Sequence, residues 1–479
     1  MKPMQDFGAV DDALLEALRD IVGPAGVVTE PAQRAAYGYD ATPGHRGRPD
    51  VVVFPTCPEH VQQVVALAAR RRVPVVPRGS GTNLSGGTVP AAGGIVLALT
   101  RMNRVLEIDE ANLTATVEPG VVTAQLHRAV EARGLFYPPD PGSQAVSTIG
   151  GNLAENAGGL RGLKYGVTGD YAMGLQVVLA SGEVVETGGK NVKDVAGYDL
   201  THLFVGSEGT LGIITRATLR LLPLPEHRRV ALAVFGDLEA AARAVSAIIA
   251  ARIIPATLEF LDRGTVEAVE AYAHVGLPSG AQAVLLMAQD GPREAVDRDV
   301  ERMAAICRRE GAREVEVAGS EAEGEQLMAA RRYALSALAR LRPTTILEDA
   351  TVPRSRLAEM VRAIQAAAER HRVRICTFGH AGDGNLHPTC LTDERDPDEM
   401  ARVEAAFEEI FDAAVRLGGT ITGEHGVGLA KREFLPWRVG PGALEVMRAI
   451  KQALDPGGIL NPGKIFAERP RRRRVVHAG

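Results

Sequence analysis

Segments rich in apolar residues alternate with amphipathic segments along the first half of the chain. Apolar residues recur at helical spacing over residues 11–22, 58–71 and 122–133, which predicts three helices. Short apolar runs between and after them predict buried strands. The expected strands cover residues 51–54, 73–76, 95–99, 115–118, 174–179 and 184–186. This alternation indicates a first domain that mixes helices with sheet.

The pattern changes after residue 225, where strand and helix periods follow one another regularly. This order is typical of an α/β plait, in which helices cover one face of a sheet. A closing part of the chain is rich in predicted helix. The expected elements are strands at 229–235 and 283–289 and helices at 238–251, 293–310, 397–417 and 441–454.

Composition narrows the classes of function. The chain has 479 residues, 46% of them hydrophobic, which is enough for two or three packed domains. The formal net charge of −5 and the 4% of aromatic residues argue against nucleic acid as a partner. The four cysteines lack metal-binding spacing, so reduced thiols in a cytoplasmic protein are expected. Neither a signal peptide nor a membrane span is expected, because no long apolar run occurs.

Three glycine-rich stretches fall at residues 77–87, 138–159 and 205–212. Glycine has no Cβ, so backbone N–H groups in such loops can converge on an anion. The first stretch is not a dinucleotide fingerprint, because no glycine follows Gly81 at the required spacing, and it lacks the Gly-Lys-Ser/Thr of a Walker loop. Taken singly, each stretch is also compatible with an ordinary turn.

A pair of histidines flanks the Asp-Gly dipeptide at residues 383–384. Asp-Gly favours a two-residue type I′ turn, which would place His380 directly opposite His387 with Cβ atoms about 5 Å apart. Two imidazoles at that separation can share one metal ion. Further along, Glu424 and His425 offer a carboxylate and a third imidazole. Two histidines and one carboxylate are typical of a catalytic divalent-metal site, whereas the alternative for each histidine is a purely structural role.

In their order along the chain, these motifs resemble those of the flavoproteins with a vanillyl-alcohol-oxidase-type FAD domain. Residues 77–83 are similar to the pyrophosphate loop of that domain, residues 141–159 to its second flavin-contacting stretch, and residues 193–215 to its third. The resemblance continues through the histidine pair to residues 461–464 and so covers nearly the whole chain. By motif, the chain is most similar to the FAD subunit of bacterial glycolate oxidase, to D-lactate dehydrogenases and to D-2-hydroxyglutarate dehydrogenase.

The resemblance implies an α+β fold. It consists of a vanillyl-alcohol-oxidase or PCMH-type FAD-binding domain, an α/β plait substrate (cap) domain and a C-terminal helical segment. The expected boundaries are an N-terminal helical segment at 1–48, the FAD-binding domain at 49–225, a substrate- and metal-binding cap domain at 226–429, a C-terminal FAD-contacting segment at 430–468 and a basic tail at 469–479.

The resemblance also implies which residues bind FAD. They are Pro77, Arg78, Gly79, Ser80, Gly81, Thr82, Asn83, Pro141, Gly142, Ser143, Thr148, Gly151, Asn152, Asn156, Gly158, Glu208, Gly212, Ile213 and Asn461. Members with covalently attached flavin often carry a histidine in the first loop. Residues 79–83 contain no histidine or cysteine, so FAD is expected to be bound non-covalently.

The implied reaction is oxidation of a D-2-hydroxy acid to the 2-oxo acid, with hydride transfer to the flavin. His380, His387 and Glu424 would hold a divalent metal, with Zn favoured and Mn or Fe as alternatives, which lowers the pKa of the substrate hydroxyl. His425 would accept the proton. Arg331 would grip the substrate carboxylate, although the family's Trp three positions earlier is a methionine here and the adjacent arginine remains an alternative.

Glycolate or D-lactate is the favoured substrate, because Pro388 resembles the glycolate oxidase subunit and Thr389 stands where hydroxyglutarate enzymes carry Asn. The expected electron acceptor is a quinone, a cytochrome, an electron-transfer flavoprotein or an iron–sulfur subunit. Glycolate oxidase partner subunits, a homodimer and attachment to the inner face of the membrane through a partner are further expectations. The alternatives are a flavin subunit with only an assembly role, and a related FAD oxidase whose substrate is not a hydroxy acid.

Overall fold

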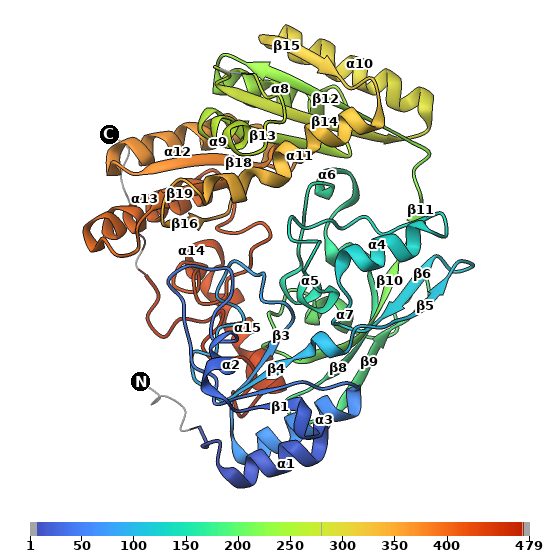
Figure 1. Cartoon of the computed structure of the whole chain (residues 1–479), viewed down its shortest axis with the longest axis vertical. Coiled ribbons are helices and arrows are strands. Elements are labelled where there is room, and N and C mark those ends of the chain that lie inside the picture. The colour runs from blue at the N-terminus through green and yellow to red at the C-terminus, as the bar shows by residue number, and fades with distance from the viewer. Residues whose placement is uncertain (1–6, 279, 472, 474–479) are drawn as a thin grey trace. The chain divides into compact units, whose positions relative to one another are not determined.

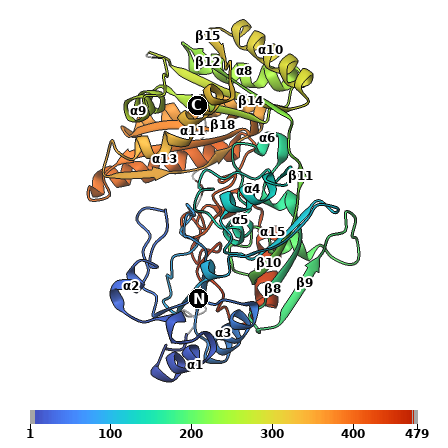
Figure 2. The same ribbon diagram turned by 45° about the vertical axis from the view of Figure 1, so that its right-hand side comes forward.

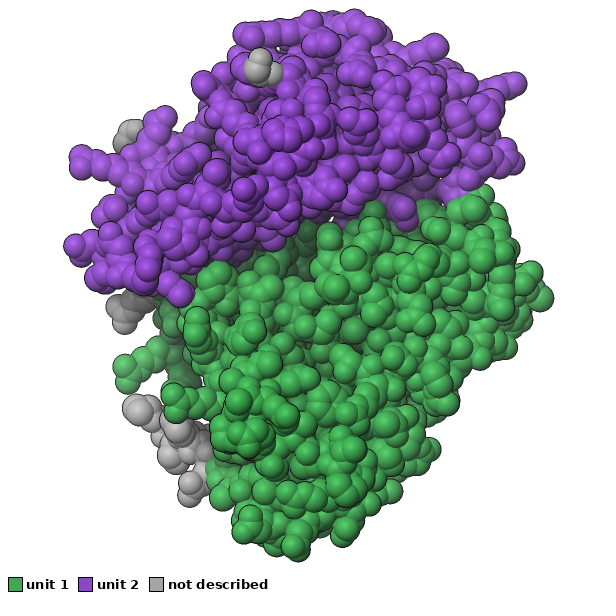
Figure 3. Space-filling model, in the orientation of Figure 1, with its two compact units in different colours: residues 1–157, 167–224, 424–472 green, residues 158–166, 225–423, 473–479 purple. Residues whose placement is uncertain are grey.

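The computed structural model describes residues 7–278, 280–471 and 473, and its chain divides into two compact units. Unit 1 comprises residues 1–157, 167–224 and 424–472, and unit 2 comprises residues 158–166, 225–423 and 473–479 (Figure 3). The first six residues and most of the basic tail predicted at 469–479 lie outside the described residues. Each unit is built from segments that are distant in sequence.

Unit 1 contains two main sheets and short helices (Figure 1). Its strands are β1 (Val27–Val28), β2 (Val51–Val53), β3 (Val75–Arg78), β4 (Ile95–Ala98), β5 (Val105–Asp109), β6 (Thr114–Val117), β7 (Leu135–Phe136), β8 (Ala172–Val178), β9 (Val184–Gly188), β10 (Ile213–Arg220) and β11 (Leu222–Pro223). Its α-helices are α1 (Asp12–Val22), α2 (Pro31–Ala35), α3 (Pro58–Arg71), α4 (Thr123–Glu131), α5 (Ile149–Glu155), α7 (Leu200–Phe204), α14 (Leu435–Arg438) and α15 (Pro441–Leu454). Its 3₁₀ helices are η1 (Pro24–Gly26), η2 (Leu99–Arg101) and η3 (Thr168–Tyr171).

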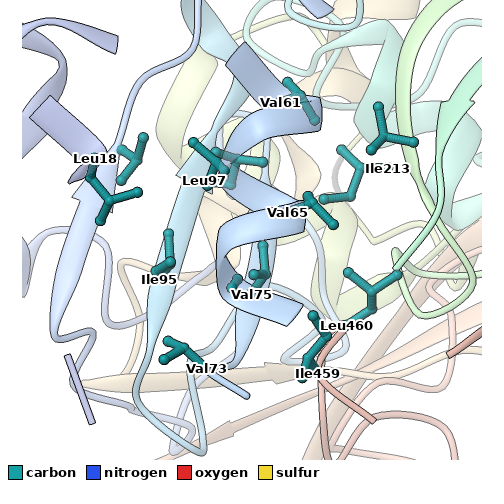
Figure 4. Close-up of a cluster of buried hydrophobic side chains, with 14 of the residues drawn as sticks. Leu18, Val61, Val65, Val73, Val75, Ile95, Leu97, Ile213, Ile459 and Leu460 are labelled. Carbon is teal, nitrogen blue, oxygen red and sulfur yellow. The ribbon is translucent and has the colours of Figure 1, made fainter. Parts of the chain in front are cut away.

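The smaller sheet of unit 1 has the order β1-β2-β4-β3, with β2 and β3 both parallel to β4. Helix α3 begins with Pro58 at a position where no N–H is needed, and it ends where Arg72 adopts a left-handed conformation. Its buried residues recur at helical spacing and join the strand residues in one apolar cluster (Figure 4). Members of the cluster labelled there include Val61, Val65, Val75, Ile95, Leu97, Ile213 and Leu460. The cluster therefore ties the C-terminal segment to the N-terminal strands.

The larger sheet of unit 1 is antiparallel, in the order β5-β6-β10-β8-β9, and Figure 2 shows β8, β9 and β10 side by side. Between β9 and α7 the chain forms a loop whose residues are mostly exposed. Val192, Val195 and Tyr198 in this loop are each more than nine-tenths exposed. Lys190 anchors the start of the loop by ion pairs with Glu107 and Asp109 on β5.

Unit 2 is built on an eight-stranded sheet in the order β15-β12-β14-β13-β18-β19-β16, with β17 also paired to β19. Its strands are β12 (His227–Phe235), β13 (Thr257–Asp262), β14 (Ala283–Gly291), β15 (Ala312–Val317), β16 (Thr344–Leu347), β17 (Ala350–Thr351), β18 (Arg374–His380) and β19 (Asn385–Thr392). Its helices are α6 (Gly162–Tyr165), α8 (Leu238–Ala250), α9 (Arg263–Ala273), α10 (Arg293–Arg309), α11 (Glu321–Leu338), η4 (Arg354–Arg356), α12 (Leu357–His371), η5 (Ala381–Asp383) and α13 (Pro397–Arg416).

Strand β14 of unit 2 is buried more completely than the sequence predicted. Every residue from Ala283 to Asp290 on β14 is buried. Successive strand residues point to opposite faces, so both faces of β14 are covered, whereas the sequence predicted helices on one face only. Among the described residues, no helix is long and apolar enough to cross a membrane.

Candidate active site

The two histidines of the sequence motif lie on the hairpin formed by β18 and β19 in unit 2. The strands pair His380 with Asn385 and Phe378 with His387, so the prediction that the histidines lie directly opposite each other is wrong. The connection is not a two-residue type I′ turn. It is the 3₁₀ turn η5, after which Gly384 alone takes a left-handed conformation, with φ of 79°. The loop is therefore two residues longer than predicted, and the register shifts accordingly.

The shifted register still places His380 and His387 on the same face, as diagonal neighbours. Their ring centroids are 5.1 Å apart with the planes at 89°, and one ring nitrogen of each lies within 4.8 Å of the other. Both side chains are buried. The pair can therefore share a metal ion, as the sequence suggested, although by a different geometry.

A carboxylate that sequence reasoning missed lies next to this pair. Glu259 on β13 is fully buried, and its Oε1 is 2.7 Å from Nδ1 of His380. Its Oε2 accepts a hydrogen bond of 2.5 Å from Nε of Arg331. Burial opposes ionisation, but His380 and Arg331 together hold the pKa of Glu259 below its ordinary value. The one hint in the sequence is an acidic residue within an otherwise buried strand.

The structure separates the two arginines that the sequence left as alternatives. Arg331 on α11 is buried, and its guanidinium carbon lies 4.6 Å from the centre of the Phe378 ring. Arg332 is exposed and pairs with Glu325 on its own helix. Because Arg331 shares Glu259 with a histidine of the pair, Arg331 is the better candidate for binding substrate.

Asp349 is a second buried carboxylate that the sequence did not reveal. Its Oδ1 lies 3.6 Å from Nδ1 of His387, and its Oδ2 accepts hydrogen bonds from Oγ1 of Thr422 at 3.0 Å and from the N–H of Gly423 at 2.6 Å. Gly423 is bonded to Glu424, whose Cα is therefore about 3.8 Å further on. Asp349 thus fixes the backbone of Gly423, the residue directly before the predicted ligand Glu424.

In unit 1 the chain continues through residues 424–428, here called the strap. The carboxylate of Glu208 accepts hydrogen bonds of 2.7 Å from the backbone N–H groups of both Val427 and Gly428. Glu208 has a positive φ of 52°, which is strained for a residue with a side chain. The sequence assigned Glu208 to FAD, whereas in the structure its side chain holds the strap.

Glu208 is close to a second carboxyl group, that of Glu155. A Cβ at Gly426 of the strap would lie 2.2 Å from Oε2 of Glu155 and 3.2 Å from Oε1 of Glu208. Burial and the charge of Glu208 raise the pKa of Glu155 well above its ordinary value. Burial also raises the pKa of Glu208, but its two N–H donors oppose this shift. The N–H donors thus favour the charged form of Glu208, whereas burial and the neighbouring carboxylate disfavour the charged form of Glu155.

The glycine-rich loops that the sequence assigned to FAD touch one another within unit 1. A Cβ at Gly79 would lie 2.2 Å from Oγ1 of Thr148, and a Cβ at Gly209 would lie 2.4 Å from the ring of Pro77. The first loop therefore contacts both the second and the third, and a Cβ at either glycine would force its neighbour to shift. Backbone groups from all three loops can face a common ligand.

The C-terminal motif joins the same group of loops. Nδ2 of Asn461 donates hydrogen bonds to the carbonyl oxygens of Gly87 and Glu208, and its backbone N–H donates to the carbonyl of Val75. Lys464 donates to the carbonyl of Val89. The C-terminal segment therefore closes the arrangement that the resemblance implied, although the side chain of Asn461 is committed to the backbone.

Several other residues assigned to FAD use their side chains to hold the loops. Arg78 donates to the Tyr39 carbonyl and to Thr88. The others with such roles are Asn83, bonded to Asp40, Asn152, bonded to Thr123, and Asn156, bonded to the N–H of Gly169. The remaining assigned residues of unit 1 are Ser80, Gly81, Thr82, Pro141, Gly142, Ser143, Gly151, Gly212 and Ile213, and Gly158 falls in the segment that belongs to unit 2.

Comparison with known proteins places these features in a family. Residues 49–188 match the FAD binding domain, and residues 224–465 match the C-terminal domain of FAD linked oxidases. The fold and the matched domains define an FAD-dependent oxidoreductase. The chain belongs to the family of FAD-linked oxidases.

Individual relatives agree with this assignment. The chain is 58% identical over 461 residues to glycolate oxidase subunit GlcD of Bacillus subtilis strain 168, covering 96% of this chain and 98% of that protein. It is 36% identical to a D-lactate dehydrogenase of Anaerostipes hadrus, covering 88% and 90% of the two chains. The solved structure of p-cresol methylhydroxylase with substrate bound has a TM-score of 0.77 at 20% identity, covering 94% of this chain and 96% of that one. The expected PCMH-type α+β fold is thereby confirmed.

Proposed function

We propose that this protein oxidises a small D-2-hydroxy acid, glycolate or D-lactate, to the corresponding 2-oxo acid. The relatives named as glycolate oxidase subunits and D-lactate dehydrogenases support this substrate class. The observation that carries the proposal is the carboxylate of Glu259 between Arg331 and His380. A 2-hydroxy acid has a carboxylate and a neighbouring hydroxyl group. Arg331 offers a cation for the carboxylate, and His380 beside it offers a ligand for a metal ion at the hydroxyl.

The donor set fits a divalent metal. Nδ1 of His380 lies 2.7 Å from Oε1 of Glu259, and such a carboxylate behind a histidine is usual for metal ligands. His387 lies on the same face, and Glu424 follows directly after the anchored Gly423. We propose His380, His387 and Glu424 as the ligands of Zn, with Mn or Fe as alternatives. Bound there, the ion would supply Lewis acidity at the substrate hydroxyl.

Arg331 would bind the substrate carboxylate. Its guanidinium is planar and can donate two parallel hydrogen bonds to a carboxylate. Glu259 holds the Nε edge of that plane and the Phe378 ring lies against it, so the group is oriented before substrate arrives. Because the donor is oriented in advance, less conformational entropy is lost when the substrate binds.

His425 would accept the hydroxyl proton, because imidazole is the side chain best suited to this task near neutral pH. Residue 425 lies in the strap that Glu208 holds through Val427 and Gly428. Glu208 would thereby limit the motion of His425.

FAD, held non-covalently by the glycine-rich loops of unit 1, would supply the hydride acceptor.

The substrate class is tested with a panel of glycolate, D- and L-lactate, D-malate and D-2-hydroxyglutarate and an artificial electron acceptor, before and after chelation. Glycolate or D-lactate should give the highest kcat/KM, and chelation should abolish turnover. Activity only with an aryl-ether or alkyl-phosphate substrate, insensitive to chelators, would instead identify a related FAD oxidase. No turnover with any hydroxy acid would favour a subunit with an assembly role.

The electron acceptor and partners are proposed from the relatives. Because two of the relatives are named as glycolate oxidase subunits, we propose that partner subunits bind this chain and receive its electrons. A quinone, a cytochrome, an electron-transfer flavoprotein and an iron–sulfur subunit are the acceptor classes to be compared. Co-purification after co-expression with candidate subunits tests the proposal.

A further inference from the structure

We propose that Glu259 is a positioning residue that couples the substrate-binding arginine to the metal site. This inference rests on the proposed function and adds to it a thermodynamic link: the affinity for metal depends on Arg331, which is not a ligand, and the affinity for substrate depends on Glu259, which does not touch it. The link passes through the two oxygens of one carboxylate.

Backbone pairing sets the position of Glu259. Strand β13 pairs with β18 through Phe260 with Gly379 and Leu261 with Phe378. The same antiparallel register, continued by one residue, brings Glu259 level with His380. The distance of 2.7 Å between Oε1 and Nδ1 follows from this placement. The carboxylate is therefore held by the sheet itself and not by a mobile loop.

The second oxygen of Glu259 is held from the other side. Nε of Arg331 lies 2.5 Å from Oε2, and the guanidinium lies over the Phe378 ring. A fully buried carboxylate is stable only if its charge is compensated, and here the partners are Arg331 and the His380 ring. Each partner therefore limits the freedom of the carboxylate that orients the other.

This arrangement predicts reciprocal effects. If the arginine fork is removed, Oε2 loses its directed partner, the carboxylate can rotate, and the His380 ring is held less well. If the carboxylate is removed, the ring and the guanidinium both lose their orientation. By linkage, metal binding at His380 and substrate binding at Arg331 change each other's affinity by the same factor. If this buried ion pair had only a structural role, substituting Arg331 would lower the stability of the protein but would not change its affinity for metal.

The test is a double-mutant cycle on the full-length flavoprotein. Zn²⁺ affinity is measured by competition with a chromogenic chelator for the wild type, Glu259→Gln, Arg331→Lys and the double variant. Glu259→Gln should weaken Zn²⁺ binding by about 10–100-fold. Arg331→Lys, which keeps the charge and loses the fork, should weaken it several-fold in the wild-type background and have no further effect in Glu259→Gln.

Two controls keep the outcome decisive. Arg332→Lys changes the exposed neighbour and should leave Zn²⁺ affinity at the wild-type value. If Glu259→Gln does not fold, Glu259→Asp replaces it, because it retracts the carboxylate while keeping its charge. Steady-state kinetics should show that Glu259→Gln also raises KM for the hydroxy acid.

Equal effects of Arg331→Lys in both backgrounds would overturn the coupling, and so would Zn²⁺ affinity of Glu259→Gln within twofold of the wild type. Either result leaves the proposed metal site standing, since the wild type would still bind Zn²⁺. Absence of stoichiometric Zn²⁺ binding by the wild type would overturn the proposed metal site itself, and the coupling with it. The two failures are therefore distinguishable.

Discussion

Glu208 accepts a hydrogen bond from the backbone N–H of Gly428 at 2.7 Å, although 220 residues separate the two in sequence. Its other oxygen accepts from Val427, also at 2.7 Å. A Cβ at Gly428 would lie 2.1 Å from the carbonyl oxygen of Ser85, so a larger residue has no room there. The strap behind the proposed proton acceptor is thus fixed by one carboxylate and one glycine.

The substitution Glu208→Gln should therefore destabilise the protein. The amide can accept at only one position, so one buried N–H loses its partner, at a cost of about 1–3 kcal/mol in the free energy of unfolding. Urea unfolding followed by circular dichroism measures the loss. The matched control is Glu155→Gln, because burial and the charge of Glu208 raise the pKa of Glu155 and an amide imitates a protonated carboxyl. Glu155→Gln should cost less stability than Glu208→Gln, and equal losses in the two variants would contradict the different roles of the two carboxyl groups.

The flavin should be released intact when the protein is denatured with acid. Residues 79–83 offer no histidine or cysteine for covalent attachment. The supernatant should contain FAD, identified by its absorbance and chromatographic retention. Yellow colour remaining with the precipitated chain would show that the flavin is covalently attached.

Removing either histidine of the hairpin should remove the metal and spare the flavin. His380→Ala and His387→Ala each delete one proposed ligand, and loss of ligand support typically costs about 10–100-fold or more in metal affinity. Apart from residues 158 and 159, the glycine-rich loops belong to unit 1, whereas the hairpin belongs to unit 2, so FAD content should stay at the wild-type level. Metal analysis and flavin absorbance check the two expectations. A wild type without stoichiometric metal, unaffected by chelators, would contradict them.

His425→Ala should slow flavin reduction by about 10²–10⁴-fold if His425 is the proton acceptor. FAD content should be unchanged and most of the metal retained, because His380, His387 and Glu424 remain. Stopped-flow measurement of flavin reduction with saturating substrate gives the rate. A rate within a few-fold of the wild type would assign proton transfer to another group.

The stability of unit 2 should depend on pH through Asp262. Burial raises the pKa of Asp262 to about 6 from 3.8, although hydrogen bonds from Thr265 and the N–H of Thr377 oppose the shift. Between about pH 4 and 6 the folded protein therefore binds the proton more tightly than the unfolded chain. By linkage, the contribution of Asp262 to the free energy of unfolding falls as pH rises through this window. The free energy of unfolding of the wild type minus that of Asp262→Asn should fall as the pH rises from about 4 to 6. It should level off above about pH 7. A difference that rises or stays constant over that window would contradict the shift.

The local sequence pattern was sufficient to predict the bounds of two of the helices. Helices predicted at 58–71 and 441–454 occur with those bounds, because their periodicity and the prolines at their first positions act within a few residues. The strand predicted at 73–76 instead covers Val75–Arg78. Its start is shifted because Val75 is paired on one side with Ile95 and bridged on the other to Leu460, partners that are distant in sequence.

The sequence by itself determined the family, the order of the flavin loops and the candidacy of His380, His387, Glu424 and His425. Only the tertiary structure decided the register of the histidine hairpin, since it depends on the turn actually formed and on the strands alongside. Only the structure revealed that the carboxylates of Glu259, Asp349 and Glu208 accept hydrogen bonds from groups 72 to 220 residues away along the chain. A buried carboxylate is explained by the groups that compensate its charge, and the fold alone brings those groups together.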